Sequence, residues 1–235
     1  MGNAVCSYSS AVWEDIKANR LDDWKLVTIL IGYNDICSVC MDFSSQDIDG
    51  APDQFSSNVM VALDYLRDNL PSTFVNLVQI TDLGALRREA PQASSPLAPT
   101  CTFFVDTICP CFSRLTHNGN TMFDNIVQRY RQNLQSLVES GRYRQSRDFD
   151  VVLQPFQRTL ELDSNGGNDP LSFLANDCSH FSPTGNRLAA ISLWNNMFER
   201  VGEKSDTLSL ATAGRIHCPT NKQPYFATSW GRSHF

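Results

Sequence analysis

The clearest feature of the hydrophobic pattern is a short apolar run at residues 25–31 (KLVTILI), which ends at Gly32. Both faces of this run are apolar, which is typical of a strand buried in a parallel sheet. Residues 72–80 (STFVNLVQI) and 148–156 (DFDVVLQPF) have a similar character. The pattern therefore predicts three strands.

Between these strands the apolar spacing changes to that of a helix. In residues 53–70 the apolar positions are three and four residues apart, and Pro71 follows, which predicts an amphipathic helix. Residues 122–143 return to helical spacing, with Gly141 as the expected C-terminal cap. Residues 182–201 predict a last helix, with Ser182 as N-cap and Pro183 in the first helical position.

The elements alternate along the chain in a way that is typical of a parallel sheet with helices on both faces. A length of 235 residues suits one α/β domain. Residues 86–100 and 163–170 read as loops, and residues 101–112 show no clear period. Ligands of such sheets bind at the carboxyl ends of the strands.

The composition excludes some classes of partner. The net charge of −6 argues against nucleic-acid binding, which needs a basic surface. No apolar run approaches the roughly 20 residues of a membrane-spanning helix. The first residues lack the pattern of a signal peptide, and Cys6 stands where a myristoylation motif has Ser or Thr.

The chain has eight cysteines, and an even number favours disulfides and an oxidising compartment. The absence of a signal peptide and of any Asn-x-Ser/Thr motif weighs against a secreted protein. Cys37 and Cys40 with Cys109 and Cys111 could form a four-thiolate zinc site, although the second spacing is short for that motif. We favour disulfides and expect a local Cys37–Cys40 bridge; the other pairings stay open.

Two segments after predicted strands carry candidate chemistry. The Asp177 carboxylate can orient the His180 imidazole as a general base, although the two residues could simply cap a helix. Asn34, in the segment GYND, could donate to an oxyanion, and Gly32 would permit the sharp turn there. The alternative for this segment is an ordinary turn. The three other histidines read as surface residues: His117, His217 and His234.

Together, GYND at 32–35 and DCSH at 177–180 resemble blocks III and V of the GDSL, or SGNH, lipase/esterase superfamily. Within it, the chain resembles the membrane-associated phospholipase B family. The resemblance is nearly continuous from Asp23 to Thr228 and rests on motifs in a fixed order: DWKLVTILIGYNDIC, FVNLVQI, CPC, ESGRY with DFDVVLQPF, DCSHFSPTGNRLAAISLWNNMFERVG, and CPTNKQPYFAT.

This resemblance implies a three-layer α/β/α sandwich of the flavodoxin-like SGNH type. It implies His180 as general base, Asp177 as the residue that orients it, and Asn34 with Gly32 in the oxyanion hole. The family hydrolyses acyl esters of phospholipids, lysophospholipids and related lipids such as acylglycerols through an acyl-enzyme, without metal or cofactor. It further implies an extracellular or membrane-associated protein whose longer form meets a membrane surface.

The expected nucleophile is missing, since the chain has no Gly-Asp pair and no Gly-x-Ser-x-Gly motif. The glycine of block II cannot be placed either. Ser38 and the three serines near the amino terminus lack the glycine-flanked turn of a nucleophile; the latter are Ser7, Ser9 and Ser10.

We therefore expect residues 1–235 to be one amino-terminally truncated hydrolase domain. Its first part, residues 1–22, would be an unmatched start followed by a helix, and residues 219–235 would be an irregular tail. We expect the strand at 25–31 to be exposed or only partly covered. The chain as given should be inactive. The alternatives are a non-catalytic product that acts by binding lipid or protein, and a fragment that does not fold stably.

Overall fold

The computed structural model describes residues 23–42, 48–83, 98–115, 122–161, 173–209 and 216–230, with only the backbone of residues 42 and 98–102. Its main sheet contains β1 (Lys25–Ile29), β2 (Thr73–Val78) and β3 (Phe149–Gln154), in the order β1-β2-β3. Both strand pairs are parallel. All three expected strands are therefore present, each a few residues shorter than its apolar run.

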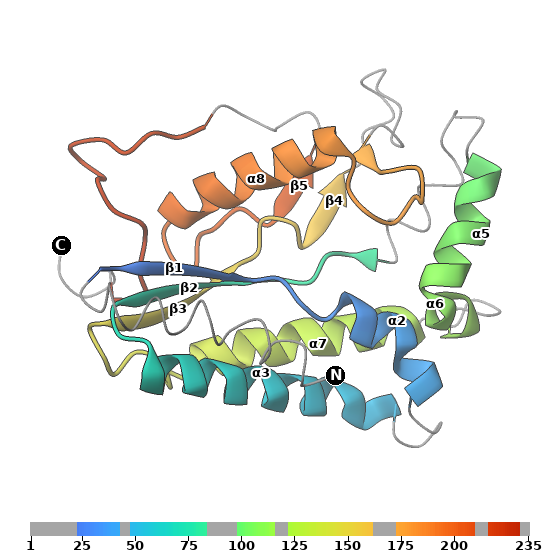
Figure 1. The fold of residues 1–235 in the computed structure, drawn as a ribbon, viewed down its shortest axis with the longest axis horizontal. Helices are drawn as coiled ribbons and strands as arrows, with labels where there is room; N and C mark the ends of the chain where they lie inside the picture. The colour runs from blue at the N-terminus through green and yellow to red at the C-terminus, as the bar shows by residue number, and fades with distance from the viewer. Residues whose placement is uncertain are drawn as a thin grey trace.

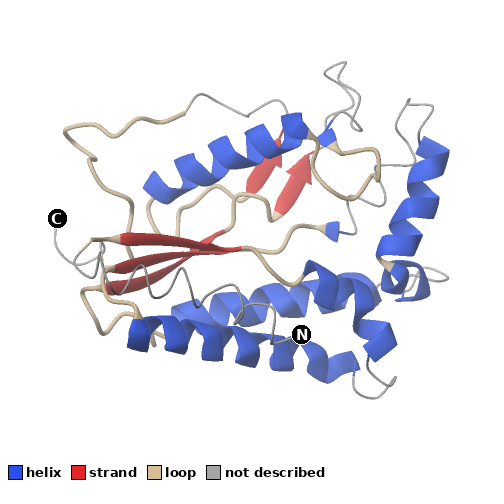
Figure 2. Cartoon of the chain, in the orientation of Figure 1, coloured by secondary structure: helices blue, strands red, loops and turns tan. Residues whose placement is uncertain are grey.

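Helices occupy both faces of this sheet, as Figure 1 shows, and Figure 2 separates them from the strands by colour. One face carries α3 and α7, and the other face carries α8. The helices are α2 (Tyr33–Asp42), the 3-10 turn η1 (Ile48–Gly50), α3 (Ala51–Asn69), α5 (Ala98–Ile108), α6 (Pro110–Leu115), α7 (Met122–Glu139) and α8 (Pro183–Phe198). This is a three-layer α/β/α arrangement, as expected.

The helical spacing in the sequence places the core correctly. On α3, the side chains of Phe55, Val59 and Leu63 are buried in the same cluster as residues of α7 and of β2. Pro52 lies in the first turn of α3, where its missing N–H costs no hydrogen bond. After α7, Gly141 has a φ of +81°, which confirms the expected left-handed residue beyond that helix.

β1 shows that one expectation was right and another was wrong. It is an edge strand of the described sheet, and Leu26 is 50 % exposed, as expected for a partly covered strand. The interpretation of residues 25–31 as buried on both faces is therefore wrong. Val27 and Ile29 pack against the α3–α7 layer, whereas Leu26 and Thr28, on the other face of the strand, are exposed.

Two further parts of the fold differ from the sequence pattern. Residues 101–112, which show no period, form the end of α5 and the beginning of α6, with Cys109 between the two helices. A small second sheet joins β4 (Thr159–Glu161) to β5 (Thr207–Ser209), and the pattern did not predict it. The expectations for residues 1–22, 86–100 and 163–170 concern segments that lie wholly or mostly outside the described residues, and so do the last five residues of the expected tail 219–235.

Candidate active site

The His180 imidazole and the Asp177 carboxylate are in direct contact. Nδ1 of His180 lies 2.7 Å from Oδ2 of Asp177. The other carboxylate oxygen accepts hydrogen bonds from the backbone N–H groups of Ser179 and His180, each at 3.0 Å. When Nδ1 carries the proton it donates to Asp177, and Nε2 is then the nitrogen that can accept a proton.

The loop that carries this pair is closed by backbone hydrogen bonds. Leu174 and Phe181 form an isolated antiparallel bridge, and the Ala175 N–H donates to the carbonyl oxygen of His180 at 2.8 Å. At the tip, Cys178 has a φ of +58°, which is unusual for a residue with a side chain. Cys178 is buried and disulfide-bonded. Tertiary structure therefore holds the strained turn between Asp177 and His180.

The first turn of α8 fixes the other end of the loop. Ser182 is its N-cap, with the side chain accepting a hydrogen bond from the Gly185 N–H at 3.1 Å, as the sequence predicts. Gly185 is required because a Cβ there would lie 2.3 Å from the carbonyl oxygen of Phe173. This close approach joins α8 to the strand-like segment that precedes Asp177.

The surroundings of Asp177 favour its ionised form. Burial raises the pKa of this carboxyl, but the hydrogen bonds from the His180 backbone, the His180 ring and the Ser179 backbone outweigh burial and lower the pKa to about 2. The side chain of Asp177 is 36 % exposed and that of His180 is 75 % exposed. The pair therefore keeps a carboxylate beside an accessible imidazole.

Gly32 and Asn34 lie where β1 leads into α2. Gly32 has a φ of +113°, and a Cβ at this position would lie 2.8 Å from Ile80 Cδ1. Only glycine avoids both the strained backbone and this contact. Asn34 then lies in the first turn of α2, so the segment GYND is the beginning of a helix rather than an isolated turn.

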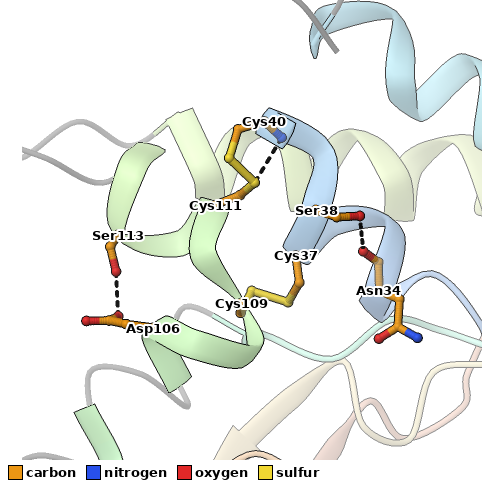
Figure 3. The surroundings of a disulfide bond; sticks show 8 residues. All are labelled: Asn34, Cys37, Ser38, Cys40, Asp106, Cys109, Cys111 and Ser113. Atoms are coloured by element: carbon orange, nitrogen blue, oxygen red, sulfur yellow. Dashed lines mark hydrogen bonds between the residues drawn. A yellow bond between two sulfur atoms is a disulfide. The ribbon is translucent and has the colours of Figure 1, made fainter. Parts of the chain in front are cut away.

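Two disulfides attach α2 to the α5–α6 segment (Figure 3). Cys37 pairs with Cys109, and Cys40 pairs with Cys111. The expected Cys37–Cys40 bridge is therefore wrong. The two cysteines lie one turn apart on α2, so both can face α5 and α6. The four sulfur atoms of the zinc alternative are thus engaged in disulfides.

A buried polar cluster beneath the strand ends was not found from the sequence. The Tyr33 hydroxyl lies 2.7 Å from Thr81 Oγ1 and accepts from Gln157 Nε2 at 3.0 Å. Arg131 donates from Nε to the carbonyl oxygen of Ile80 at 2.8 Å. Burial raises the pKa of Tyr33 and lowers that of Arg131. The sequence does contain one indication of this cluster. Arg131 lies four residues after Val127 and therefore falls on the apolar side of α7.

The two halves of the site lie at the same end of the sheet. In Figure 1 the beginning of α2 and the loop before α8 are both at the end to which the parallel strands point. Val78, the last residue of β2, belongs to the same buried cluster as Phe173 and Cys178. The imidazole–carboxylate pair and the segment that carries Asn34 thus belong to elements at the same end of the sheet, where ligands of parallel sheets bind.

Among the described residues, no cluster of histidine, cysteine, aspartate and glutamate has the composition of a metal site. In the same part of the chain, no helix is long and apolar enough to cross a membrane. His217 is at the protein surface, and its backbone N–H donates to Asn195 Oδ1, whereas His117 and His234 are outside the described residues.

The sequence is similar to those of known proteins. Residues 9–193 match the family model described as GDSL-like Lipase/Acylhydrolase. The chain is 34 % identical over 217 residues to "Phospholipase B1, membrane-associated" of Homo sapiens, covering 91 % of this chain and 14 % of that protein. The Rattus norvegicus protein of the same name is 33 % identical over 226 residues, 94 % of this chain and 15 % of the relative. The chain thus spans about one seventh of the length of these relatives. No solved structure matched.

Proposed function

Because the chain belongs to the GDSL-like lipase/acylhydrolase family, which is a family of ester-hydrolysing enzymes, we propose that it supplies part of a phospholipase B-like active site. The substrates would be acyl esters of phospholipids, lysophospholipids or acylglycerols. The relatives named phospholipase B1 support the lipid class. The observation that carries the proposal is the 2.7 Å contact between His180 and Asp177.

In the proposed mechanism, His180 removes the proton of a serine hydroxyl, which attacks the ester carbonyl and forms an acyl-enzyme. His180 then gives that proton to the leaving alcohol and activates water in the second half of the reaction. Asp177 holds the ring and stabilises the imidazolium. Asn34, with the backbone at Gly32, would donate to the oxyanion; one such donor is worth roughly 2.7–4 kcal/mol in a transition state.

We further propose that the nucleophilic serine is not part of this chain. Ser38 donates from its hydroxyl to the carbonyl oxygen of Asn34 at 2.7 Å within α2, which does not suit a nucleophile. Ser182 is buried and caps α8. Neither serine has the exposed position on a sharp turn that nucleophilic attack requires. β1 is an edge strand of the described sheet, and a further strand could add to the sheet there.

An extracellular or membrane-associated location is part of the proposal. The disulfides at α2 support an oxidising compartment. The relatives are named membrane-associated, and this chain would meet the membrane as part of a longer form. The net charge of −6 gives no support to a nucleic-acid partner.

The test uses the purified chain, a nitrophenyl butyrate ester and a serine-directed fluorophosphonate probe. We expect little or no turnover and no labelled serine, because a site without its nucleophile retains at best weak catalysis. Mass spectrometry locates any label. Stoichiometric labelling of one serine that His180→Ala abolishes would show that a nucleophile is present after all.

The second candidate is a non-catalytic product that binds lipid or protein. The missing nucleophile and the half-exposed apolar strand β1 favour it. Adding the chain to a separately produced polypeptide that carries a Gly-Asp-Ser segment distinguishes the two candidates. Turnover that appears on mixing and disappears with His180→Ala supports the catalytic role, whereas binding without turnover supports the second candidate.

A further inference from the structure

The exposed face of α5 is apolar to a degree that is unusual for a surface helix. Phe103 is 69 % exposed, Phe104 is 37 % exposed and Ile108 is 39 % exposed. These three positions, with Thr107, lie within an arc of about 140° around the helix. The rings of Phe103 and Phe104 contact each other with centroids 5.9 Å apart. We call these four residues the α5 face.

Two polar side chains on or beside the α5 face, Thr107 and Asp106, take part in hydrogen bonds within the protein. The Thr107 hydroxyl donates to the carbonyl oxygen of Phe103 at 2.8 Å, so its methyl group is left to the surface. Asp106, on another side of the helix, accepts from the Ser113 hydroxyl. The segment 98–108 contains no lysine or arginine. The face therefore offers apolar contact without a positive charge.

α5 is held between the two halves of the candidate site. Cys109, at its carboxyl end, is bonded to Cys37 of α2, the helix that begins beside Asn34 (Figure 3). On the buried side, Val105 belongs to the same apolar cluster as Phe173 and Cys178 of the loop that carries His180. A surface that binds the α5 face is thus brought next to the candidate site.

We propose that the α5 face docks on a neutral lipid surface, such as a phosphatidylcholine bilayer or micelle. The proposal rests on the proposed function, because a lipid-cleaving site must reach substrate that is aggregated. Two aromatic side chains and an aliphatic one suit insertion at the boundary between head groups and acyl chains. The net charge of −6 and the absence of a base on α5 favour a zwitterionic surface over an anionic one.

The experiment measures co-sedimentation of the whole chain with phosphatidylcholine vesicles. The double substitution Phe103→Ser and Phe104→Ser should lower the vesicle partition coefficient by about tenfold or more, since it removes two large apolar side chains. The matched control is Val61→Ser on α3, a helix of the α3–α7 layer, where Val61 is 65 % exposed. That control should bind as the parent chain does, and high salt should leave binding unchanged.

A second variant gives a gain of signal. Phe103→Trp should show a blue shift of tryptophan emission when vesicles are added, relative to the parent chain under the same conditions. Unchanged binding of the double variant, an equal loss in Val61→Ser, or a strict need for anionic lipid would overturn the proposal. So would a change of oligomeric state in the double variant without lipid, because the face would then bind a second copy. None of these outcomes depends on ester turnover, so a failed hydrolase proposal is recognised separately.

Discussion

β1 and β2 are hydrogen-bonded neighbours, yet their burial is opposite to what their sequences indicate. β2 contains the polar residues Thr73 and Asn76, and all six of its side chains are buried. β1 is followed directly by two more apolar residues, and Leu26 and Leu30 are about half exposed. Position in the sheet decides the difference, because β2 has a strand on each side and a helical layer on each face.

The buried polar groups of β2 are accommodated by partners on both sides. Asn76 Nδ2 lies 3.3 Å from Thr28 Oγ1 of β1, and Gln154 of β3 donates to Asn76 Oδ1 at 2.8 Å. A buried amide is tolerated where it is hydrogen-bonded. Burial of a polar residue in a central strand thus depends on its neighbours, which a local pattern does not contain.

The largest effect expected from this contrast is on stability. Leu77→Ala in β2 removes a fully buried side chain and should lower the free energy of unfolding by about 2–5 kcal/mol. Leu26→Ala in β1 should lower it by less than about 1 kcal/mol, because half of that side chain already contacts water. Urea denaturation of both variants measures the difference. Equal losses would mean that something covers β1 as fully as β2.

β3 is the other edge strand of the described sheet, but unlike β1 it is covered. A smaller effect on stability is expected there than at Leu77. Asp150 of β3 is buried, and its carboxylate accepts from the Ser229 N–H at 2.8 Å and from the Ser229 hydroxyl at 2.5 Å. Phe226, three residues earlier, packs against Phe74 and Phe198. The carboxyl-terminal segment thus covers a face of the sheet near β3, a cover that the described residues do not provide at β1.

The contribution of the Asp150–Ser229 contact to stability should depend on pH. Burial raises the pKa of the Asp150 carboxyl above its ordinary value of 3.8, and the Ser229 hydrogen bonds only partly oppose this. The stabilising contribution of a group with a raised folded pKa is complete below the unfolded pKa and is lost as the pH rises through the folded pKa. Asp150→Asn cannot ionise, so its free energy of unfolding relative to that of the parent should rise over this range. Denaturation between pH 3 and pH 7 measures it, and a pH-independent difference would contradict it.

The sequence predicted much of the fold because its elements obey local periods. The cap at Ser182, the glycine at 141 and the helix through Phe55 were all readable from spacing, and the structure confirms them. The cysteine pairing was not, because a bridge from Cys37 to Cys109 joins residues 72 positions apart. The same limit hid the buried polar cluster, in which Tyr33, Thr81 and Gln157 follow three different strands.

For the site, the residue pattern and the family resemblance named His180 and Asp177, and the structure brings these two together. This was possible because the two residues are three positions apart on one loop. The positions of Asn34 and Gly32 follow from the end of β1. Their roles in catalysis stay predictions. That the nucleophilic serine is not part of this chain also stays a prediction.

The smallest effect on stability, and the most specific for the β1 edge, is expected from Leu26→Lys. Long apolar edge strands pair with other chains, and a lysine on such an edge is a common means of preventing this. Because Leu26 is half exposed, the lysine should keep its charge in water and change the free energy of unfolding by less than about 0.5 kcal/mol. Self-association, measured by light scattering at increasing protein concentration, should nevertheless decrease.

The control is Val61→Lys on α3, which adds the same charge far from the strand edge and should leave self-association unchanged. An equal decrease in both variants would point to net charge, and no decrease in either would mean that the edge of β1 is not the surface through which copies of the chain associate.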